Sequence, residues 1–438
     1  MTLAASTLPS DAAVIRKVFR RLIPFLVLMY VFAYLDRMNI GFASLSMNRD
    51  LGLSAAMFGF ASTAFFATYS LAEIPSNLLC ARLGAHRWLP RIVLVWGIAS
   101  MATMWVSGPN SLYVVRALVG LAEAGFVPGV LYYLGHWMPR EQRAKANALF
   151  LLALPIALAV GGPLSGLILQ LPDPLGLASW RWLFLLEGAP AVILGVIAFF
   201  YLPAGPASAR WLTAAEREVI AERLAQDHAV EAAALASRPT SIWRQLASLP
   251  MIFLALGYFT LAATINTYSL WSPQMIRDFL GEASSTLTVS LWAGLPPLIA
   301  GAVSLVAGIR SDRTGERKAY LVALMLIASI GWVMVAEAPG AGLKMTGLVF
   351  AAIGAFATPA IFWALTVPLI AARFRAVAIA AISTVGLLAS VVSPTIVGSL
   401  RDLTQNFSAG VWYVAVMLFF GAGLIQAVAR QPRRALPA

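Results

Sequence analysis

The sequence predicts an all-α membrane protein with twelve transmembrane helices, arranged as two halves of six helices each. The composition is the first reason: of 438 residues 60% are hydrophobic and 11% charged, which leaves too little charge to cover a water-soluble chain of this length. The second is that apolar runs of about 20 residues, the length that crosses a bilayer, recur along the chain. The third is a weak internal repeat, which indicates that the halves are related by duplication.

The elements follow one another with short connections. A polar arm, residues 1–21, precedes the first half at 22–202, and a tail at 430–438 follows the second half at 250–429. The hydrophilic stretch between the halves, 203–249, is predicted to be a cytoplasmic linker. We expect membrane spans at 22–46, 54–80, 90–108, 111–136, 144–170, 181–202, 250–272, 286–310, 319–338, 342–370, 376–400 and 409–429.

The linker contains the start signal of a helix. Thr213 and Glu216 have the spacing of a capping box, in which each side chain bonds the backbone N–H of the other residue. A run rich in Glu, Arg and Ala continues from there to His228. This pattern predicts a water-exposed helix within the linker.

The distribution of Lys and Arg sets the expected orientation. If the N-terminus is cytoplasmic, 24 of the 31 Lys and Arg residues fall on the inner side and five on the outer side. The remaining two, Arg37 and Arg116, lie inside spans. This asymmetry follows the positive-inside rule and places both termini in the cytoplasm. The net charge of +12 therefore reflects membrane topology and not a nucleic-acid surface.

The internal repeat has an offset of about 231 residues. Arg82, which follows the second span, recurs as Arg313 after the eighth, and Pro128 recurs as Pro359. Further matches in nearly the same register, on either side of the linker, support two related halves of six helices.

Four charged residues lie at membrane depth in the first half. Asp36 and Arg37 interrupt the first span, and Arg116 and Glu123 lie seven positions apart in the fourth, on one helical face. Gly120 lies between the latter two and is expected to leave room beside them. Guanidinium groups bind carboxylates through two parallel hydrogen bonds, which predicts an anion site at Arg37 and Arg116. The alternative is a neutral ion-pair network that only holds the helices together.

The two carboxyl groups of this set are candidates for proton coupling. A proton neutralises a carboxyl in an apolar cavity, so Glu123 and Asp36 are predicted to exchange protons as the anion binds and leaves. Asp36 points about 100° away from Arg37 on a helix, and its alternative role is to orient the arginine. Two further embedded acids have other expected roles: Glu73 in gating or helix packing, and Glu187 in pairing with Arg181.

Aromatic and polar residues complete the predicted binding site. Tyr34 lies one turn from Arg37, and Tyr69 lies midway along the second span. The second half has no charge in the middle of a span. Trp and Tyr are also ordinary membrane-interface residues, so a structural role is the alternative for each aromatic residue. The candidates of the second half are Asn266, Trp271, Trp363 and Ser390.

The residues 308–318 resemble a signature loop of the major facilitator superfamily, Gly-x-x-x-Asp-Arg-x-Gly-Arg-Lys-Lys, with Glu316 in place of its first basic residue. The resemblance implies the major facilitator fold, alternating access and function as a monomer. It also implies a gating role for Asp312 and Arg313, because a loop carboxylate can bridge to a helix terminus of the facing half. In the first half Ala81 replaces the corresponding Asp.

Within that superfamily the chain resembles the anion:cation symporter family. The likeness is carried by Tyr34-x-Asp36-Arg37-x-Asn39, Glu73-Ile-Pro75-Ser-Asn77, the stretch from Arg116 to Gly129 and Trp180-Arg-Trp-Leu-Phe-x-x-Glu187-Gly. It implies bacterial permeases for tartrate, phthalate or sugar acids. Gly161-Gly162-Pro163-x-x-Gly166 resembles a motif of drug:proton antiporters, and close helix packing through small residues is its alternative explanation.

These observations predict a proton-coupled importer of an organic acid anion in the bacterial inner membrane, in contact with lipid. The alternatives are a proton antiporter that exports amphipathic compounds and a nutrient sensor that does not transport. The sequence shows no catalytic constellation and no phosphate-binding loop that would indicate an enzyme. No cofactor is expected. Cys80, as the single cysteine, and three scattered histidines predict no metal site.

Overall fold

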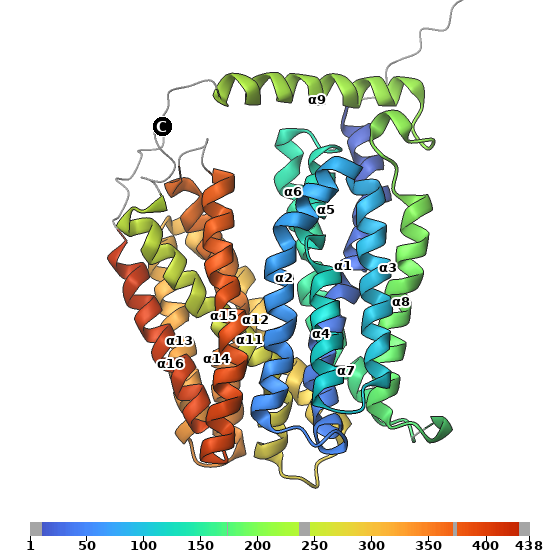
Figure 1. The fold of residues 1–438 in the computed structure, drawn as a ribbon. Helices are drawn as coiled ribbons and strands as arrows, with labels where there is room; N and C mark the ends of the chain where they lie inside the picture. Colours follow the sequence, from blue (N-terminus) through green and yellow to red (C-terminus); the bar gives the residue numbers. More distant parts are fainter. Residues whose placement is uncertain (1–10, 173, 236–245, 371–374, 429–438) are drawn as a thin grey trace, which may run out of the picture. The chain divides into compact units, whose positions relative to one another are not determined.

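The computed structural model describes residues 11–172, 174–235, 246–370 and 375–428. Within these ranges every regular element is a helix, and twelve helical stretches are long and apolar enough to cross a membrane (Figure 1). The predicted all-α fold with twelve spans is therefore confirmed. Residues 1–10 of the expected arm, part of the linker and the expected tail at 430–438 lie outside the described residues.

The spans follow the expected order. The first six are α1 (Asp11–Asp50), α2 (Ala55–Leu83), α3 (Ala85–Ala102) with Thr103–Trp105, α4 (Pro109–Glu123) with α5 (Phe126–Gly135), α6 (Arg140–Leu151) with α7 (Ala153–Ile168), and α8 (Ser179–Tyr201). The linker contains α9 (Ala214–Leu235). The last six are α11 (Leu249–Leu280), α12 (Thr286–Thr314), α13 (Arg317–Glu337), α14 (Ala341–Thr366) with Val367–Leu369, α15 (Arg375–Thr404) and α16 (Ser408–Ala427).

Two spans that we expected to be continuous are interrupted. The fourth stops at Glu123 because Gly125 adopts a φ of +84°, which is outside the helical range. A Cβ atom at Gly125 would also lie 2.5 Å from Ser76 Oγ, so no larger residue fits there. The fifth is interrupted at Leu152, between α6 and α7, where the Leu152 N–H donates to the carbonyl oxygen of Leu149 at 3.3 Å in the tighter three-residue pattern. The first interruption places Glu123 at a helix end.

The described chain forms two compact units, which we treat separately. The first comprises Met1–Ala43 and Ala64–Arg238, and the second comprises Ser44–Thr63 and Pro239–Ala438. Helices α1 and α2 are thus divided between the units. These units differ from the expected halves, 22–202 and 250–429, in the assignment of residues 44–63.

Small residues bring helices of the first unit into close contact. A Cβ atom at Gly195 of α8 would lie 2.7 Å from the backbone nitrogen of Leu94 on α3. One at Gly97 would lie 2.8 Å from the backbone nitrogen of Val192. The backbones of α3 and α8 therefore touch, as in other membrane helix pairs whose interfaces carry small residues.

In the second unit, the start of α2 is held by α15. The carboxylate of Asp402 accepts hydrogen bonds from the backbone N–H groups of Ala55 and Ala56 at 2.9 and 2.8 Å. It supplies the negative charge that favours a helix N-terminus and occupies two of its free donors. A Cβ atom at Gly398 would lie 2.3 Å from the carbonyl oxygen of Ala55, so the contact also requires glycine.

The linker helix of the first unit docks on the start of α1. The predicted capping box is present: the Thr213 N–H donates to Glu216 at 2.8 Å, and the Glu216 N–H donates to Thr213 Oγ1 at 3.2 Å. Glu216 also pairs with Lys17 at 2.8 Å. Because Lys17 and the Thr213 backbone donate to this carboxylate, the pKa of Glu216 is lowered from its ordinary value.

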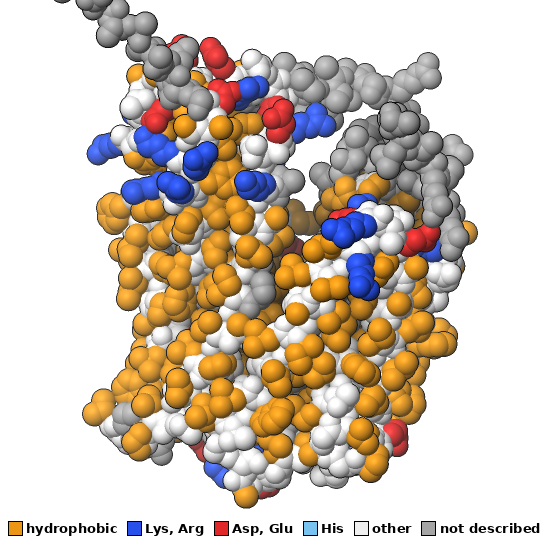
Figure 2. Space-filling model, turned by 180° about the vertical axis from the view of Figure 1, so that it is seen from behind, with side chains coloured by type: hydrophobic (Ala, Val, Ile, Leu, Met, Phe, Trp, Pro, Cys, Tyr) orange, Lys and Arg blue, Asp and Glu red, His pale blue; other side chains and the backbone are white. Residues whose placement is uncertain are grey.

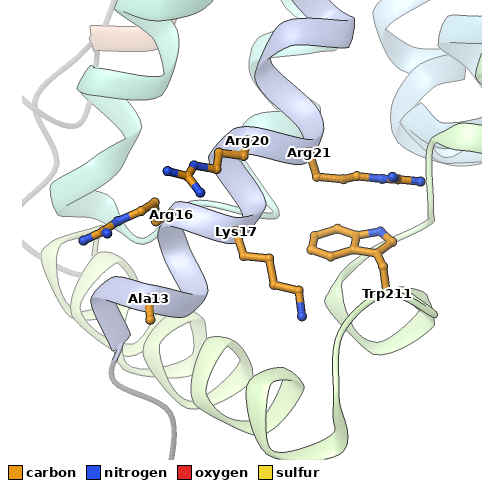
Figure 3. Close-up of a pocket in the computed structure, with 6 residues that line it drawn as sticks. All are labelled: Ala13, Arg16, Lys17, Arg20, Arg21 and Trp211. Carbon is orange, nitrogen blue, oxygen red and sulfur yellow. The ribbon is translucent and has the colours of Figure 1, made fainter.

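A basic pocket lies beside this contact. Its volume is about 390 Å³. Arg21 points to the side of α1 on which Trp211 lies, whereas Arg16 and Arg20 point to the other side (Figure 3). In the first unit Lys and Arg side chains gather at one end of the band of hydrophobic side chains (Figure 2). The pocket is lined by Ala13, Arg16, Lys17, Arg20, Arg21 and Trp211.

Candidate functional site

The first unit contains a buried ion pair between α1 and α4. Glu123 is 2% exposed, and its Oε1 accepts a hydrogen bond from Arg37 Nε and forms an ion pair with Arg37 Nη2, each at 2.7 Å. The side chain of Arg37 remains 24% exposed. Among the described residues Oε2 of Glu123 has no hydrogen-bond partner. Two of the four predicted membrane charges thus form one pair that retains an unused acceptor.

Arg116 supplies a second guanidinium next to this pair. It is 3% exposed, and its guanidinium carbon lies 4.6 Å from the centroid of the Phe65 ring. Its charge interacts with those of Glu123 and Arg37, and its Nε has no hydrogen-bond partner within the described chain. A buried guanidinium with an unused donor is costly in apolar surroundings and is typical of a site that receives an anion.

Helix α2 forms an aromatic wall against the two arginines. The guanidinium carbon of Arg37 lies 5.1 Å from the ring centroid of Tyr69 and 5.8 Å from that of Phe65. Gly120 allows this approach, because a Cβ atom there would lie 2.1 Å from the Phe65 carbonyl oxygen. The expectation that Gly120 leaves room beside the charges was wrong, since α2 fills that space. Phe65 was missed because a phenylalanine in an apolar span carries no distinguishing signal.

The predicted Tyr34 lies on the same helix as Arg37, one turn earlier, and is half-buried. Its ring packs edge-on against Tyr30, with centroids 6.0 Å apart. Arg37 interacts electrostatically with both Tyr30 and Tyr34. Tyr34 therefore lies close to the arginine cluster.

Asp36 points away from Arg37, as helix geometry predicted. It is 2% exposed and accepts hydrogen bonds from Trp96 Nε1 at 2.6 Å and Ser100 Oγ at 3.0 Å, both on α3. Asn39 donates to the same carboxylate at 3.4 Å. Its hydrogen-bond donors are therefore all neutral. Trp96 and Ser100 were missed because they are far from Asp36 in sequence and resemble ordinary span residues.

Glu187 does not pair with Arg181, which corrects that expectation. It is 1% exposed, and Ser165 Oγ donates to its Oε1 at 2.8 Å. Arg181 instead donates to the carbonyl oxygen of Met104 and lies over the ring of Trp180. The spacing of six residues between Arg181 and Glu187 turns their side chains to different sides of α8.

Glu73 is half-buried on α2, one turn beyond Tyr69. The charge of Arg37 reaches its carboxylate. Glu73 therefore lies at the edge of the cluster formed by Arg37 and Arg116.

The candidates of the second unit fall into three places. Asn266 on α11 donates to Ser390 Oγ on α15 at 2.7 Å. The Trp363 ring is 5.1 Å from that of Tyr258 and half-buried. Trp271 is fully buried between aromatic rings and has no partner for its Nε1 within the described residues. Asn266 and Ser390 are thus brought together, whereas Trp271 is enclosed by Phe58 and Phe407.

The signature loop of the second unit is exposed at the end of α12. Asp312 accepts two hydrogen bonds from Arg317, at 3.1 and 2.8 Å, and Arg317 also donates to the carbonyl oxygen of Ala364 at 3.0 Å. Arg313, at the next position, is exposed. The carboxylate therefore orients an arginine that ties the loop to the end of α14.

Comparisons with known proteins agree with this architecture. A family model described as Major Facilitator Superfamily matches residues 26–394. A protein of Agrobacterium vitis named "Putative tartrate transporter" is 37% identical over 97% of this chain and 93% of its own. A "Quinolone resistance transporter" of Acinetobacter baumannii is 35% identical over 93% of each chain. The inward-open structure of the xylose transporter XylE from E. coli matches 96% of this chain and 97% of its own, with a TM-score of 0.74 at 16% identity.

Proposed function

The chain belongs to the Major Facilitator Superfamily, and on this premise we propose that it imports an organic acid anion together with protons by alternating access. Members of this superfamily are membrane transporters and not enzymes. The substrate class is a tartrate-like hydroxy acid, a sugar acid or an aromatic acid. The relative named for tartrate transport supports the first of these.

Unused hydrogen-bonding groups in the α1–α4 cluster carry the proposal. Arg37 and Arg116 supply two guanidiniums, whereas Glu123 pairs only with Arg37 and the carboxylate of Asp36 is hydrogen-bonded to α3. Arg116 keeps an unused donor, and Arg37 is accessible over a quarter of its side chain. A substrate carboxylate would supply the acceptor that Arg116 lacks and a second partner for Arg37.

Competition for Arg37 provides the coupling. A substrate carboxylate that binds Arg37 displaces Glu123, and a displaced, buried carboxylate is stabilised by a proton. Substrate and proton therefore favour each other's binding at this site, and leave together when the site opens to the other side. Asp36 acts as the second proton-coupling carboxyl, because it is buried near Arg116 without an ion-pair partner of its own.

The remaining predicted residues have supporting roles in this proposal. Tyr34 and Tyr69 form the wall beside Arg37, and Asn266 with Ser390 offers neutral hydrogen-bonding groups for substrate hydroxyls. Trp363 is the proposed aromatic contact of the second unit. Trp271 contributes to packing instead, because its indole is fully enclosed. Gating is assigned to Glu73, Asp312 and Arg313.

The proposed setting is the inner membrane, with both termini cytoplasmic and the monomer as the functional form. The orientation rests on the distribution of Lys and Arg along the chain. The protein is surrounded by lipid there and has no nucleic-acid partner.

Export of amphipathic compounds is the second candidate, because the relative from Acinetobacter baumannii is named for quinolone resistance. In both functions protons move inward down their gradient, and the two differ in whether the substrate moves with the protons or against them. Purified full-length protein in liposomes, with an inward proton gradient, should accumulate labelled tartrate, a sugar acid or phthalate against its gradient. Quinolone efflux driven by an opposing proton gradient, without acid uptake, would support the exporter, and the absence of both fluxes would support the sensor.

Two matched variants test whether the transported acid binds at Arg37. Arg37→Lys keeps the charge but loses the planar fork and should lower acid binding at least tenfold. Arg49→Lys makes the same change at an exposed position of the same helix and should leave binding unaltered. Equal effects of the two substitutions would remove Arg37 from the substrate site.

A further inference from the structure

Glu187 on α8 is a carboxyl group buried without a positive partner. It is 1% exposed, and the neutral hydroxyl of Ser165 donates a hydrogen bond to its Oε1. Within the described chain no Lys or Arg forms an ion pair with it. Among the described residues its Oε2 has no hydrogen-bond partner. The transport cycle proposed above makes no use of this residue.

Asp36 is the charged neighbour of Glu187. The two carboxyl groups are close enough for their charges to repel each other. Asn39 links them, since its Nδ2 donates to Asp36 at 3.4 Å and its amide also lies within hydrogen-bonding reach of Glu187. On the side of α4, the charges of Glu123 and Arg116 reach Asp36. These are the charged groups that face the pair.

Two ionised carboxylates are not stable in this environment. Each would be buried at membrane depth among neutral donors, and each would be opposed by the charge of the other. Carboxyl pairs in such surroundings hold one proton between them. The donors show which member holds the proton: besides the shared Asn39, Asp36 accepts from Trp96 and Ser100, whereas Glu187 accepts from Ser165. Donors stabilise the ionised form, so the proton belongs on Glu187.

Two buried acceptor atoms that lack hydrogen-bond partners indicate where that proton lies. Asn39 is completely buried, and its Oδ1 has no partner among the described residues. Glu187 Oε2, also an acceptor when ionised, has none either. A proton on Glu187 Oε2 turns this oxygen into a donor, and Asn39 Oδ1 is an unused acceptor on a side chain that reaches Glu187.

We propose that Glu187 is a proton-binding site, a carboxylic acid held protonated beside an ionised Asp36 and hydrogen-bonded to Asn39. The pair then carries a charge of minus one, and loss of the shared proton makes it minus two. Such a change alters the field that the pair exerts on Arg116, which links the pair to the anion site. This last step depends on the proposed function, whereas the protonation of Glu187 does not.

Infrared spectroscopy of the full-length protein in lipid tests the protonation without any substrate. The carbonyl stretch of a protonated carboxyl lies apart from the carboxylate bands and shifts when the sample is transferred to heavy water. Glu187→Gln should remove one such band at neutral pH. Glu337→Gln changes an exposed acid that accepts from Trp412 and should leave the band in place. A spectrum of Glu187→Gln with the band retained would overturn the proposal.

A second variant covers the case in which Glu187→Gln does not fold. Ser165→Ala removes the donor to Oε1 and should move the same band to higher frequency without abolishing it. A band that does not move belongs to another residue and contradicts the assignment.

Transport then separates this inference from the proposed function. Glu187→Gln should lose at least tenfold in proton-driven accumulation of the acid while counterflow continues, and unchanged accumulation would exclude Glu187 from coupling. Absence of acid transport in the unmodified protein would refute the proposed function and leave the infrared result intact.

Discussion

Replacement of Glu123 by glutamine tests the competition for Arg37. The substitution preserves shape and keeps an acceptor for Arg37, but it removes the negative charge that pairs with the guanidinium at 2.7 Å. A substrate carboxylate then has to displace a neutral partner. Arg37 stays charged, so its bond to the glutamine amide is still charge-assisted, and the substitution removes only the ionic part of the pair, about 1 kcal/mol for a pair that solvent reaches.

This difference sets the expected affinity. About 1.4 kcal/mol corresponds to a tenfold change in Kd, so about 1 kcal/mol corresponds to about a fivefold change. We therefore expect Glu123→Gln to bind the acid about fivefold tighter at neutral pH. The affinity of the unmodified protein should rise as the pH falls, because protonation of Glu123 releases Arg37, whereas the affinity of the variant should not change over the same range.

The assay pairs equilibrium binding with two fluxes in reconstituted vesicles. Glu123→Gln mimics the protonated acid, so it should abolish uphill, proton-driven uptake but retain counterflow, which requires no net release of protons. Glu337→Gln provides the matched control at an exposed helix end. Normal uphill uptake by Glu123→Gln, or binding that keeps the pH dependence of the unmodified protein, would refute the reasoning.

Four further predictions can be checked separately. Arg116→Lys loses the planar fork and should weaken acid binding about tenfold, measured against the unmodified protein; an unaltered Kd would exclude it from the site. Asp36→Asn should stop proton-driven uptake but keep counterflow if Asp36 titrates, whereas weaker binding with intact coupling would make it an orienting residue. A cysteine placed at Glu216 in the linker should react with a membrane-impermeant reagent only after the cells are opened; labelling of intact cells would reverse the topology. Glu216→Ala should destabilise the docking of α9 on Lys17 by about 1 kcal/mol, measured by hydrogen exchange. The pKa of Glu216 is lower in the folded protein than its ordinary value of 4.5. The stabilisation that Glu216 contributes is therefore complete above pH 4.5 and is lost as the pH falls through the lower folded-state pKa.

The sequence by itself determined the fold class and the identity of the charged residues. Hydrophobic length decides which segments cross a bilayer, because an exposed backbone is too costly there for any conformation other than a helix or a closed barrel. The same cost makes any charge within a span noticeable, so Arg37, Arg116 and Glu123 were found without coordinates. The capping box at Thr213 and Glu216 was also predictable, because it depends on neighbours three residues apart.

Only the tertiary structure decided how those charges are paired. Glu123 and Arg37 are 86 residues apart, and Asp36 and Trp96 are 60 apart, so no local rule joins them. Glu187 was expected to pair with Arg181 because the two are close in sequence, yet its donor, Ser165, comes from another helix. A helical sequence shows which residues share a face. Which face meets which is decided by the packing of small residues such as Gly120, where the α2 backbone fills the space that the sequence had left open.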